Sequence, residues 1–167
     1  MTTPGRRMGA ESRLGRVVVR ISATRTFLRL VAPVVPALDR LMHRVTHGRR
    51  MFSEGGVVPI LLLETTGARS GSPRSTPLAY IRDGEAIYVV GSNYGRERHP
   101  GWTENLLHTP SASAWIDGKQ CSVRAELLGP VQKEAVWPKL VAAWPNYDVY
   151  AQRSGRDLRV FQLSERP

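Results

Sequence analysis

The stretch STPLAYIRDGEAIYVVGS, residues 75–92, decides the fold. Two segments rich in β-branched and aromatic residues flank the Asp-Gly pair at 83–84, and such a pair is typical of the two-residue turn of a β-hairpin. A second unit of the same kind follows at 112–127, with Asp-Gly at 117–118. Strands joined by hairpins, with few helices between them, favour an antiparallel sheet or a small barrel over a doubly wound fold.

The remaining elements also follow from local patterns. Short apolar runs between turn-forming residues predict strands, and a proline at the first helical position predicts where a helix begins. These patterns predict a buried strand at 57–63, a turn at 65–73, a short helix at 102–108, a helix at 130–143 with a kink or break at Pro138, and a last strand at 158–163. The predicted fold class is therefore α+β.

The charge of the chain is unevenly distributed. The chain has 167 residues, enough for one ordinary domain, and a formal net charge of +10. Residues 1–50 contain eleven arginines and two acids, whereas residues 51–167 contain 13 basic and 12 acidic residues. Because nearly all aromatic residues lie in the almost neutral body, no nucleic-acid partner is expected. The single cysteine, Cys121, excludes an internal disulfide framework and a multi-cysteine metal site.

The basic N-terminal arm, residues 1–50, has a helical period. Apolar residues recur at three- and four-residue steps, while Arg13, Arg16 and Arg20 fall on the other side. The apolar positions are Leu14, Val17, Val18, Ile21, Leu28 and Val31, and the pattern repeats at Leu38, Leu41, Met42 and Val45. Such a helix fits either the surface of an anionic membrane or a packed position on the domain with its arginines in solvent.

Two other features are not expected in the arm. Neither a secretory signal nor a membrane-spanning segment is expected, because arginine and proline interrupt its apolar runs. His43 and His47 stand one helical turn apart, but Arg44 occupies the position where a zinc protease has glutamate. The surrounding arginines repel cations, so these histidines are interpreted as ordinary helix residues.

The segment GARSGSPR, residues 67–74, is the best candidate for a binding site. Its glycines let the backbone turn and expose N–H groups, Arg69 and Arg74 supply charge-assisted donors, and Ser70 and Ser72 add hydroxyls. Together these groups suit a phosphate or a carboxylate. A surface turn with two solvated arginines explains the same residues equally well.

Two aromatic clusters offer further candidates. Trp102 could form one wall of a site for a planar ligand, with Asn105 fixing that ligand, although a tryptophan is more often part of the core. Trp144, Tyr147 and Tyr150 recur at three-residue steps and would line one side of a helical turn. They fit either the core or an aromatic cover over a flat ligand. The common nucleotide-binding loops and the nucleophile elbow are absent from the sequence.

Several motifs, taken in order, resemble those of one family. They are ETTGARSGSPR at 64–74, TPL at 76–78, GSN at 91–93 after the first hairpin, HPGW at 99–102 and NL at 105–106. Over about residues 55–155 the chain closely resembles the deazaflavin-dependent nitroreductase family, whose members are split β-barrel reductases that use coenzyme F-420. The resemblance implies an FMN-binding-like split β-barrel with peripheral helices and an N-terminal amphipathic helix. It divides the chain into the arm at 1–50 and a cofactor-binding domain at 51–167.

The resemblance also implies a cofactor site. Ala68, Arg69, Ser70 and Arg74 would hold the phosphate and the acidic tail of coenzyme F-420, and no metal is implied. The residues expected to line or enclose the deazaflavin ring are Ser75, Thr76, Pro77, Leu78, Ala79, Val90, Gly91, Ser92, Gly101, Trp102, Thr103, Glu104, Asn105 and Tyr147.

The substrate side of the site departs from the family pattern. The aromatic cluster expected to contact the substrate consists of Trp144, Tyr147 and Tyr150, and Trp144 stands where the family usually has tyrosine. Asn93 stands where lysine is common, and Ala68 stands where a basic residue is frequent. These departures leave the substrate range less defined than the cofactor.

By this resemblance the protein is expected to transfer a hydride from reduced coenzyme F-420 to a quinone, an enone or a nitroaromatic compound. Tyr147 is expected to position the acceptor and Tyr150 to polarise it, since a phenol can hydrogen-bond a developing oxyanion. The expected location is the cytoplasm, at the inner face of the cell membrane, because several relatives have a basic amphipathic N-terminus and act on membrane quinones. Two alternatives stay open: an FMN-dependent split-barrel oxidoreductase, and a non-enzymatic, membrane-associated cofactor-binding protein.

Overall fold

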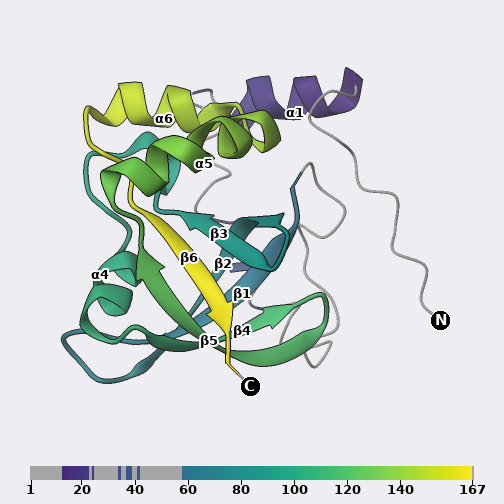
Figure 1. Ribbon diagram of the computed structural model, residues 1–167. Helices are drawn as coiled ribbons and strands as arrows, with labels where there is room; N and C mark the ends of the chain where they lie inside the picture. Colours follow the sequence, from purple (N-terminus) through teal and green to yellow (C-terminus); the bar gives the residue numbers. More distant parts are fainter. Residues whose placement is uncertain are drawn as a thin grey trace.

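Six antiparallel strands form a closed barrel in the order β1-β2-β3-β6-β5-β4 (Figure 1). The computed structural model describes residues 13–22, 24, 34, 37, 38, 41 and 58–166. The strands are β1 (Ile60–Thr66), β2 (Pro73–Asp83), β3 (Ala86–Val90), β4 (Ser111–Ile116), β5 (Lys119–Leu127) and β6 (Val160–Glu165). The α+β barrel predicted from the two hairpins is therefore confirmed.

Both predicted hairpins are present, and the φ values of the turn residues explain how the strands of each hairpin pair. In the β2–β3 hairpin Tyr80 lies opposite Val89, and the turn contains Gly84 with a φ of 60°. In the β4–β5 hairpin both turn residues have positive φ, 50° at Asp117 and 78° at Gly118. In the β4–β5 hairpin the two positive φ values match the right-handed twist of the flanking strands, as the Asp-Gly pair predicts. In the β2–β3 hairpin Asp83 pairs with Ala86, so the two-residue turn is Gly84-Glu85, one residue later than predicted, with glycine at the position that needs a positive φ.

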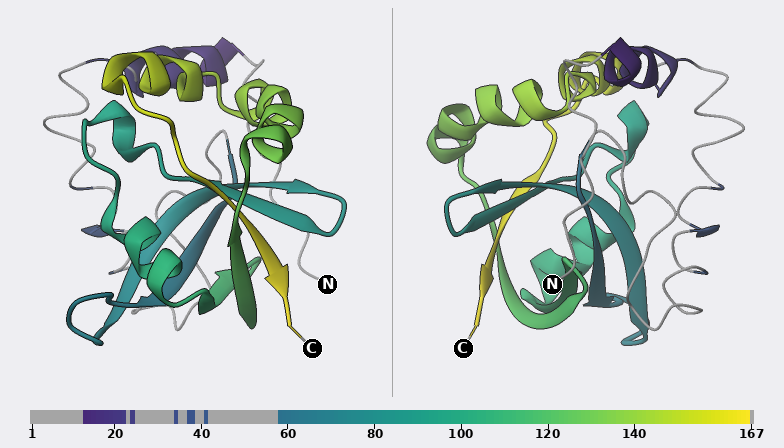
Figure 2. Two further views of the ribbon diagram at one scale, coloured as in Figure 1. Left: turned by 60° about the vertical axis from the view of Figure 1, so that its left-hand side comes forward. Right: turned by 90° about the vertical axis from the view of Figure 1, so that its right-hand side faces the viewer.

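The helices are concentrated at one end of the barrel. Two views show α1 (Arg13–Ser22), α5 (Pro130–Ala143) and α6 (Asn146–Ser154) together over that end, while the β1–β2 loop lies at the opposite end (Figure 2). Between these ends, α4 (Gly101–His108) runs along the side of the barrel, preceded by the short helix η1 (Asn93–Gly95). A ligand that contacts both the loop and the helical end must therefore extend along this side.

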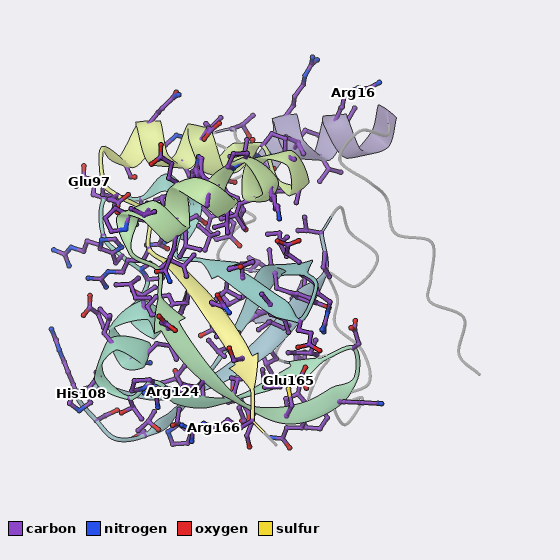
Figure 3. The ribbon with its side chains drawn as sticks, in the orientation of Figure 1. Arg16, Glu97, His108, Arg124, Glu165 and Arg166 are labelled. Atoms are coloured by element: carbon purple, nitrogen blue, oxygen red, sulfur yellow. The ribbon has the colours of Figure 1, made fainter. Side chains whose placement is uncertain are left out.

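Helix α1 packs on α6 through polar contacts. The side-chain amide of Asn146 donates to the Val19 carbonyl oxygen at 2.8 Å and to the Ser22 hydroxyl at 2.9 Å. Arg16 and Arg20 are exposed, and Arg16 points away from α6 (Figure 3). The described part of the arm thus occupies the packed position with solvated arginines. In the part of the chain that the structure describes, no helix is long and apolar enough to cross a membrane. The second apolar repeat lies largely outside the described residues, and the pair His43 and His47 lies wholly outside them.

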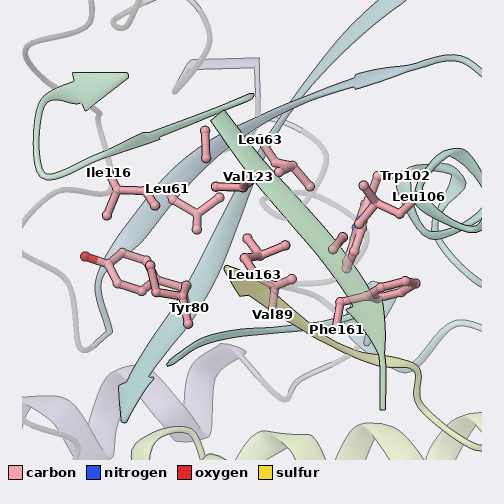
Figure 4. Packing of buried hydrophobic residues seen from close by; sticks show 13 residues of the cluster. Leu61, Leu63, Tyr80, Val89, Trp102, Leu106, Ile116, Val123, Phe161 and Leu163 are labelled. Atoms are coloured by element: carbon pink, nitrogen blue, oxygen red, sulfur yellow. The ribbon is translucent and has the colours of Figure 1, made fainter. Parts of the chain in front are cut away.

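Two hydrophobic clusters hold these layers together. Figure 4 shows the first, which fills the barrel with alternate residues of every strand and with two residues of α4. Its largest members are Leu61, Leu63, Tyr80, Ile87, Val89, Trp102, Leu106, Ile116, Val123, Phe161 and Leu163. The second cluster, which lies between the barrel and the helices α5 and α6, contains Tyr88, Val90, Leu128, Leu140, Tyr147, Tyr150, Leu158 and Val160.

Two local predictions are wrong in detail. The turn expected at 65–73 is shorter, because Thr65 pairs with Arg74 and Thr66 with Pro73 in the β1–β2 ladder. Proline can begin a strand, where its missing N–H breaks no interior ladder bond. Helix α5 also continues through Pro138 to Ala143 rather than breaking there. Both Pro138 and Glu134, whose carbonyl loses its helical donor, are exposed, so water can take the place of that donor.

Candidate functional site

The β1–β2 loop, residues 67–72, is a compact turn closed by its own backbone. The Gly67 N–H donates to the Ser72 carbonyl oxygen at 2.9 Å, and the Gly71 N–H donates to the Gly67 carbonyl oxygen at 2.8 Å. The Ser70 hydroxyl accepts from the Ser72 N–H at 3.3 Å. Gly71 has a φ of 65°, which residues with a side chain rarely adopt. The loop thus has one defined shape before any ligand binds.

Asn105 joins this loop to α4. Its Oδ1 accepts from the Ala68 N–H at 3.0 Å, and its Nδ2 donates to the Thr65 Oγ1 at 2.9 Å. Thr65 is only 4% exposed, so both partners are fixed at the base of the loop. The predicted Asn105 and loop residues are therefore brought together, but Asn105 acts on the backbone of the loop. Its amide holds α4 and the loop as one unit.

The loop has an excess of positive charge. Arg69 and Arg74 are exposed, and within residues 58–166 no carboxylate lies within ion-pairing distance of either guanidinium. Arg159, by contrast, pairs with Glu104 at 2.5 Å. Two guanidinium groups without acidic partners, next to two serine hydroxyls on a rigid turn, form a donor set that suits a phosphate or a carboxylate.

Strand β2 connects this loop with the middle of the barrel. Its residues from Ser75 to Ala79 are all half-buried, and Leu78 contacts the core, so Ser75, Pro77 and Ala79 lie on the outer face. Tyr80 pairs with Val89, which places the end of β3 beside Ala79. Ala79 lies five residues beyond Arg74, a span of about 17 Å along an extended strand. Of the predicted residues, Arg74 and residues 75–79 thus lie along one strand.

The residues after β3 are in close contact with the start of α4. The Gly91 N–H donates to the Arg159 carbonyl oxygen at 2.8 Å. A Cβ atom on Gly91 would lie 2.8 Å from Thr103 Cγ2, so only glycine allows this approach. Thr103 is fully buried, and its hydroxyl donates to the Pro100 carbonyl oxygen at 2.8 Å. The predicted residues Gly91 and Thr103 are therefore adjacent.

The side chain of Trp102 does not form a wall of the candidate ligand site. Its side chain is 6% exposed, and its ring lies 5.6 Å from that of Phe161, centroid to centroid. The indole is therefore part of the barrel core, and in this arrangement only the backbone of Trp102 can face a ligand. The neighbouring Gly101 and Glu104 are exposed at the start of α4.

The aromatic residues of α6 lie at the helical end. Tyr147 and Tyr150 are 3% and 2% exposed, and Trp144 packs half-buried against them. The Tyr150 hydroxyl donates to the Ser22 carbonyl oxygen at 3.4 Å. Burial raises the pKa of both phenols above the ordinary tyrosine value, with the neighbouring Tyr150 adding to the shift at Tyr147. Both tyrosines therefore remain protonated at neutral pH and can act only as neutral hydrogen-bonding groups.

The segment between β3 and α4 connects the aromatic cluster with the β1–β2 loop, which is called the arginine loop below because of Arg69 and the adjacent Arg74. The segment contacts the aromatic cluster and continues into α4, whose Asn105 is bonded to the loop. Tyr94 in this segment makes an edge contact with Tyr150, with ring centroids 6.3 Å apart. The sequence reasoning assigned no role to Thr65, Arg156 and Arg159, which hold the candidate site from other parts of the chain. Thr65 accepts from the Asn105 amide, Arg159 donates to the Thr103 hydroxyl, and Arg156 donates to the Gly91 carbonyl oxygen. Local pattern contains no signal for them, because their partners are about 40 to 65 residues away.

A metal site has no support in the described residues, among which no group of three His, Cys, Asp or Glu side chains could hold an ion. Cys121 is half-buried in β5, and its thiol donates to the Ala114 carbonyl oxygen at 3.4 Å. Burial raises the pKa of this thiol, which makes it a poor nucleophile at neutral pH.

The closed six-stranded barrel is the split-barrel fold found in F420-dependent reductases. The family model for F420H(2)-dependent quinone reductase matches residues 39–165. A quinone reductase of Mycobacterium tuberculosis (strain ATCC 25618 / H37Rv), named as dependent on the same reduced coenzyme, is 35% identical over 132 residues, covering 77% of this chain and 89% of the relative. The chain therefore belongs to this quinone reductase family and is an F-420-dependent reductase.

Solved structures agree with this assignment. One, described as an F420-H2 dependent reductase, has a TM-score of 0.58 and 32% sequence identity, covering 64% of this chain and 94% of its own. Another, described as a domain-swapped dimer, has a TM-score of 0.60 and 28% identity, covering 75% of this chain and 95% of its own. The family implies the use of coenzyme F-420, and the arginine loop fits the anionic part of that molecule because its guanidinium groups have no acidic partners among residues 58–166.

Proposed function

We propose that this protein transfers a hydride from reduced coenzyme F-420 to a quinone, with Arg69 and Arg74 binding the anionic part of the coenzyme. The observation that carries this proposal is the β1–β2 loop, which has a fixed shape, is bonded to Asn105 and has two exposed guanidinium groups without acidic partners in the described body. Enones and nitroaromatic compounds are the other candidate acceptors, and turnover with each class decides among them.

The remaining predicted residues have roles along the same side of the barrel. Ala68, Ser70 and the outer face of β2 would contact the coenzyme between its charged part and its ring, and Val90, Gly91 and Ser92 would meet the ring itself. The bound reduced deazaflavin supplies the hydride. Residues 101–105 would close the site from the side of α4, where Asn105 already fixes the loop.

The proton or hydrogen bond needed by the reduced acceptor would come from α6. A hydride added to a quinone leaves an oxyanion, which a neutral phenol can stabilise by donating a hydrogen bond. The Tyr150 hydroxyl is protonated at neutral pH, and its bond to the Ser22 carbonyl oxygen is long, at 3.4 Å, so an oxyanion is the stronger acceptor. Because Tyr150 is only 2% exposed, α1 would have to move away from its hydroxyl before the acceptor could reach it. Tyr147 would position the acceptor, and Trp144 would pack on its apolar part.

Titration of oxidised coenzyme F-420, followed by tryptophan fluorescence, tests the proposal. Replacing Arg69 and Arg74 with alanine removes two charge-assisted contacts of about 1 kcal/mol each at an exposed site, so Kd should rise about 30-fold. The control replaces Arg82 and Lys119, which are exposed and lie at the ends of β2 and β5 away from the loop. Equal Kd values for the two double variants would contradict the proposal, and tighter binding of FMN than of coenzyme F-420 would favour the FMN alternative.

We also propose that the arm, residues 1–50, holds the catalytic body, residues 51–167, at the cytoplasmic face of the membrane. In α1, Val17 and Ile21 are 49% and 52% exposed and lie one turn apart, beside the exposed Arg16 and Arg20. Exposed aliphatic groups flanked by arginines suit an anionic lipid surface. The protein should sediment with phosphatidylglycerol vesicles more than with phosphatidylcholine vesicles, and the V17S/I21S variant should lose that binding. Equal sedimentation with both lipids would contradict membrane binding through α1.

A further inference from the structure

The segment between β3 and α4, residues 91–99, has an unfavourable backbone conformation. Asn93, Tyr94 and Gly95 have successive φ values of 46°, 54° and 73°. Residues with a side chain rarely adopt this left-handed region, and two of the three have one. Bonds within the segment offset part of this cost: the Asn93 side-chain amide donates to the Arg98 carbonyl oxygen at 2.9 Å, and the Gly95 N–H donates to the Ser92 carbonyl oxygen at 2.9 Å. Contacts from outside the segment add to them.

Arg156, two residues after the end of the last helix, supplies contacts to residues 91–99 from outside the segment. Helix α6 ends at Ser154, and the φ of 62° at the following Gly155 turns the chain so that Arg156 lies beside the segment. Its Nε donates to the Arg96 carbonyl oxygen at 3.0 Å, its Nη1 to the Gly91 carbonyl oxygen at 3.0 Å, and its Nη2 to the Ser92 carbonyl oxygen at 2.6 Å. One half-buried guanidinium thus binds three backbone carbonyls of the same segment.

His99 completes this arrangement. Its Nδ1 lies 2.9 Å from Arg156 Nη1, and because a guanidinium only donates, Nδ1 must be the unprotonated, accepting nitrogen. Burial lowers the pKa of His99, and the neighbouring Arg159 and Arg156 lower it further, whereas Glu104 and Asp157 act in the opposite direction. Protonation at Nδ1 would replace the hydrogen bond with repulsion between two cations.

These contacts connect two parts of the candidate site. The carbonyls of Gly91 and Ser92 belong to the residues expected against the deazaflavin ring, and the same segment places Tyr94 against Tyr150. The Gly95 backbone also lies so close to α6 that an added Cβ would come within 3.1 Å of Tyr150 Cα. A shift of the segment would therefore displace both the ring-lining backbone and the surroundings of the phenol.

We propose that Arg156 and His99 form a positioning pair that holds residues 91–99 in the conformation that binds the deazaflavin ring and supports Tyr150. This inference rests on the proposed function. Arg156 is a positioning residue, since it acts through the backbone carbonyls it binds. Because the pair requires a neutral His99, binding of the coenzyme should weaken when that imidazole takes up a proton.

The first experiment compares Arg156→Met with Arg156→Lys, and uses Arg82→Met, an exposed residue at the end of β2 away from the arginine loop, as the control. Kd for oxidised coenzyme F-420 should rise about tenfold in Arg156→Met, less in Arg156→Lys, and not at all in the control. Hydrogen exchange of the cofactor-free protein should accelerate in peptides from residues 91–99 and stay unchanged in peptides from β4 and β5. An unchanged Kd and unchanged exchange in Arg156→Met would overturn the proposal.

The second experiment uses the pH dependence of binding, which a merely structural role would not alter. In His99→Asn the amide oxygen can accept from Arg156 but does not titrate. Between about pH 7.5 and about pH 5 the wild-type affinity should fall more steeply than that of His99→Asn, and the difference between the two proteins cancels any titration of the coenzyme itself. Parallel profiles would overturn the proposal. A wild-type protein that does not bind coenzyme F-420 would instead contradict the proposed function, and the exchange measurement keeps these two failures apart.

Discussion

Asn105 offers the sharpest perturbation of the candidate site, because it holds the arginine loop without contributing charge. Asn105→Ala removes the bond from the Ala68 N–H at 3.0 Å and the bond to the Thr65 hydroxyl at 2.9 Å. Only the bond to Ala68 reaches the loop, since Thr65 belongs to β1, and one hydrogen bond contributes about 1 kcal/mol net to ordering of the loop. Since the coenzyme needs the ordered loop, Kd should rise about fivefold while Arg69 and Arg74 remain present.

Asn105→Asp separates loop order from charge. The carboxylate keeps an acceptor for the Ala68 N–H, and the Thr65 hydroxyl can turn to donate to it, so thermal stability should stay near that of the wild type. The new negative charge lies beside the proposed anion site, and its effect on Kd should decrease with rising ionic strength. Fluorescence titrations at two salt concentrations, together with thermal unfolding, measure both quantities. Wild-type Kd values for both variants would refute the view that Asn105 organises a binding loop.

Three further predictions concern other parts of the structure. Gly91→Ala should lower the free energy of unfolding, measured by urea titration, by about 1–3 kcal/mol because the new Cβ overlaps with Thr103 Cγ2. Adding Thr103→Ser removes that methyl group and should restore most of the lost stability. If stability is not restored, the overlap with Thr103 is not the cause of the loss. Tyr150→Phe should lower turnover of a quinone while Kd for the coenzyme stays nearly unchanged, and full turnover would remove Tyr150 from the mechanism. Because burial raises the pKa of Tyr147, the phenol loses its proton at lower pH in the unfolded state than in the folded state, so stability should fall as pH rises above about 10. Tyr147→Phe should make this fall in stability shallower. Identical pH slopes for the two proteins would show that Tyr147 does not cause the fall.

The hairpins and the arginine loop could be predicted because their signals are local. The Asp-Gly pairs indicate both hairpins, although the first turn lies one residue later than predicted, at Gly84-Glu85. The composition of residues 67–74 indicates an exposed, basic turn. Closure of the barrel is different, since β1 pairs with β4 and β3 pairs with β6 across long stretches of sequence. No short window of sequence contains that information.

The charged residues of the candidate site could be predicted from the sequence, but the residues that hold the site in place could not. Arg69 and Arg74 are recognisable from a short motif, whereas the partners of Asn105 and Arg156 become neighbours only after the barrel closes. The role of Trp102 could not be predicted either. A tryptophan beside a candidate helix start has the same sequence pattern whether its side chain lines a ligand site or packs in the core. Its contact with Phe161 of β6, which decides between them, is non-local.

The central claim, that Arg69 and Arg74 bind the charged part of the coenzyme, is tested most directly by a thermodynamic cycle. Kd is measured for oxidised coenzyme F-420 and for the same deazaflavin with its ribityl chain but without phosphate and acidic tail, on wild type and on R69A/R74A. The wild type should prefer the charged molecule by about 30-fold, and the double variant should bind both molecules about equally. An undiminished preference in the double variant would contradict the claim.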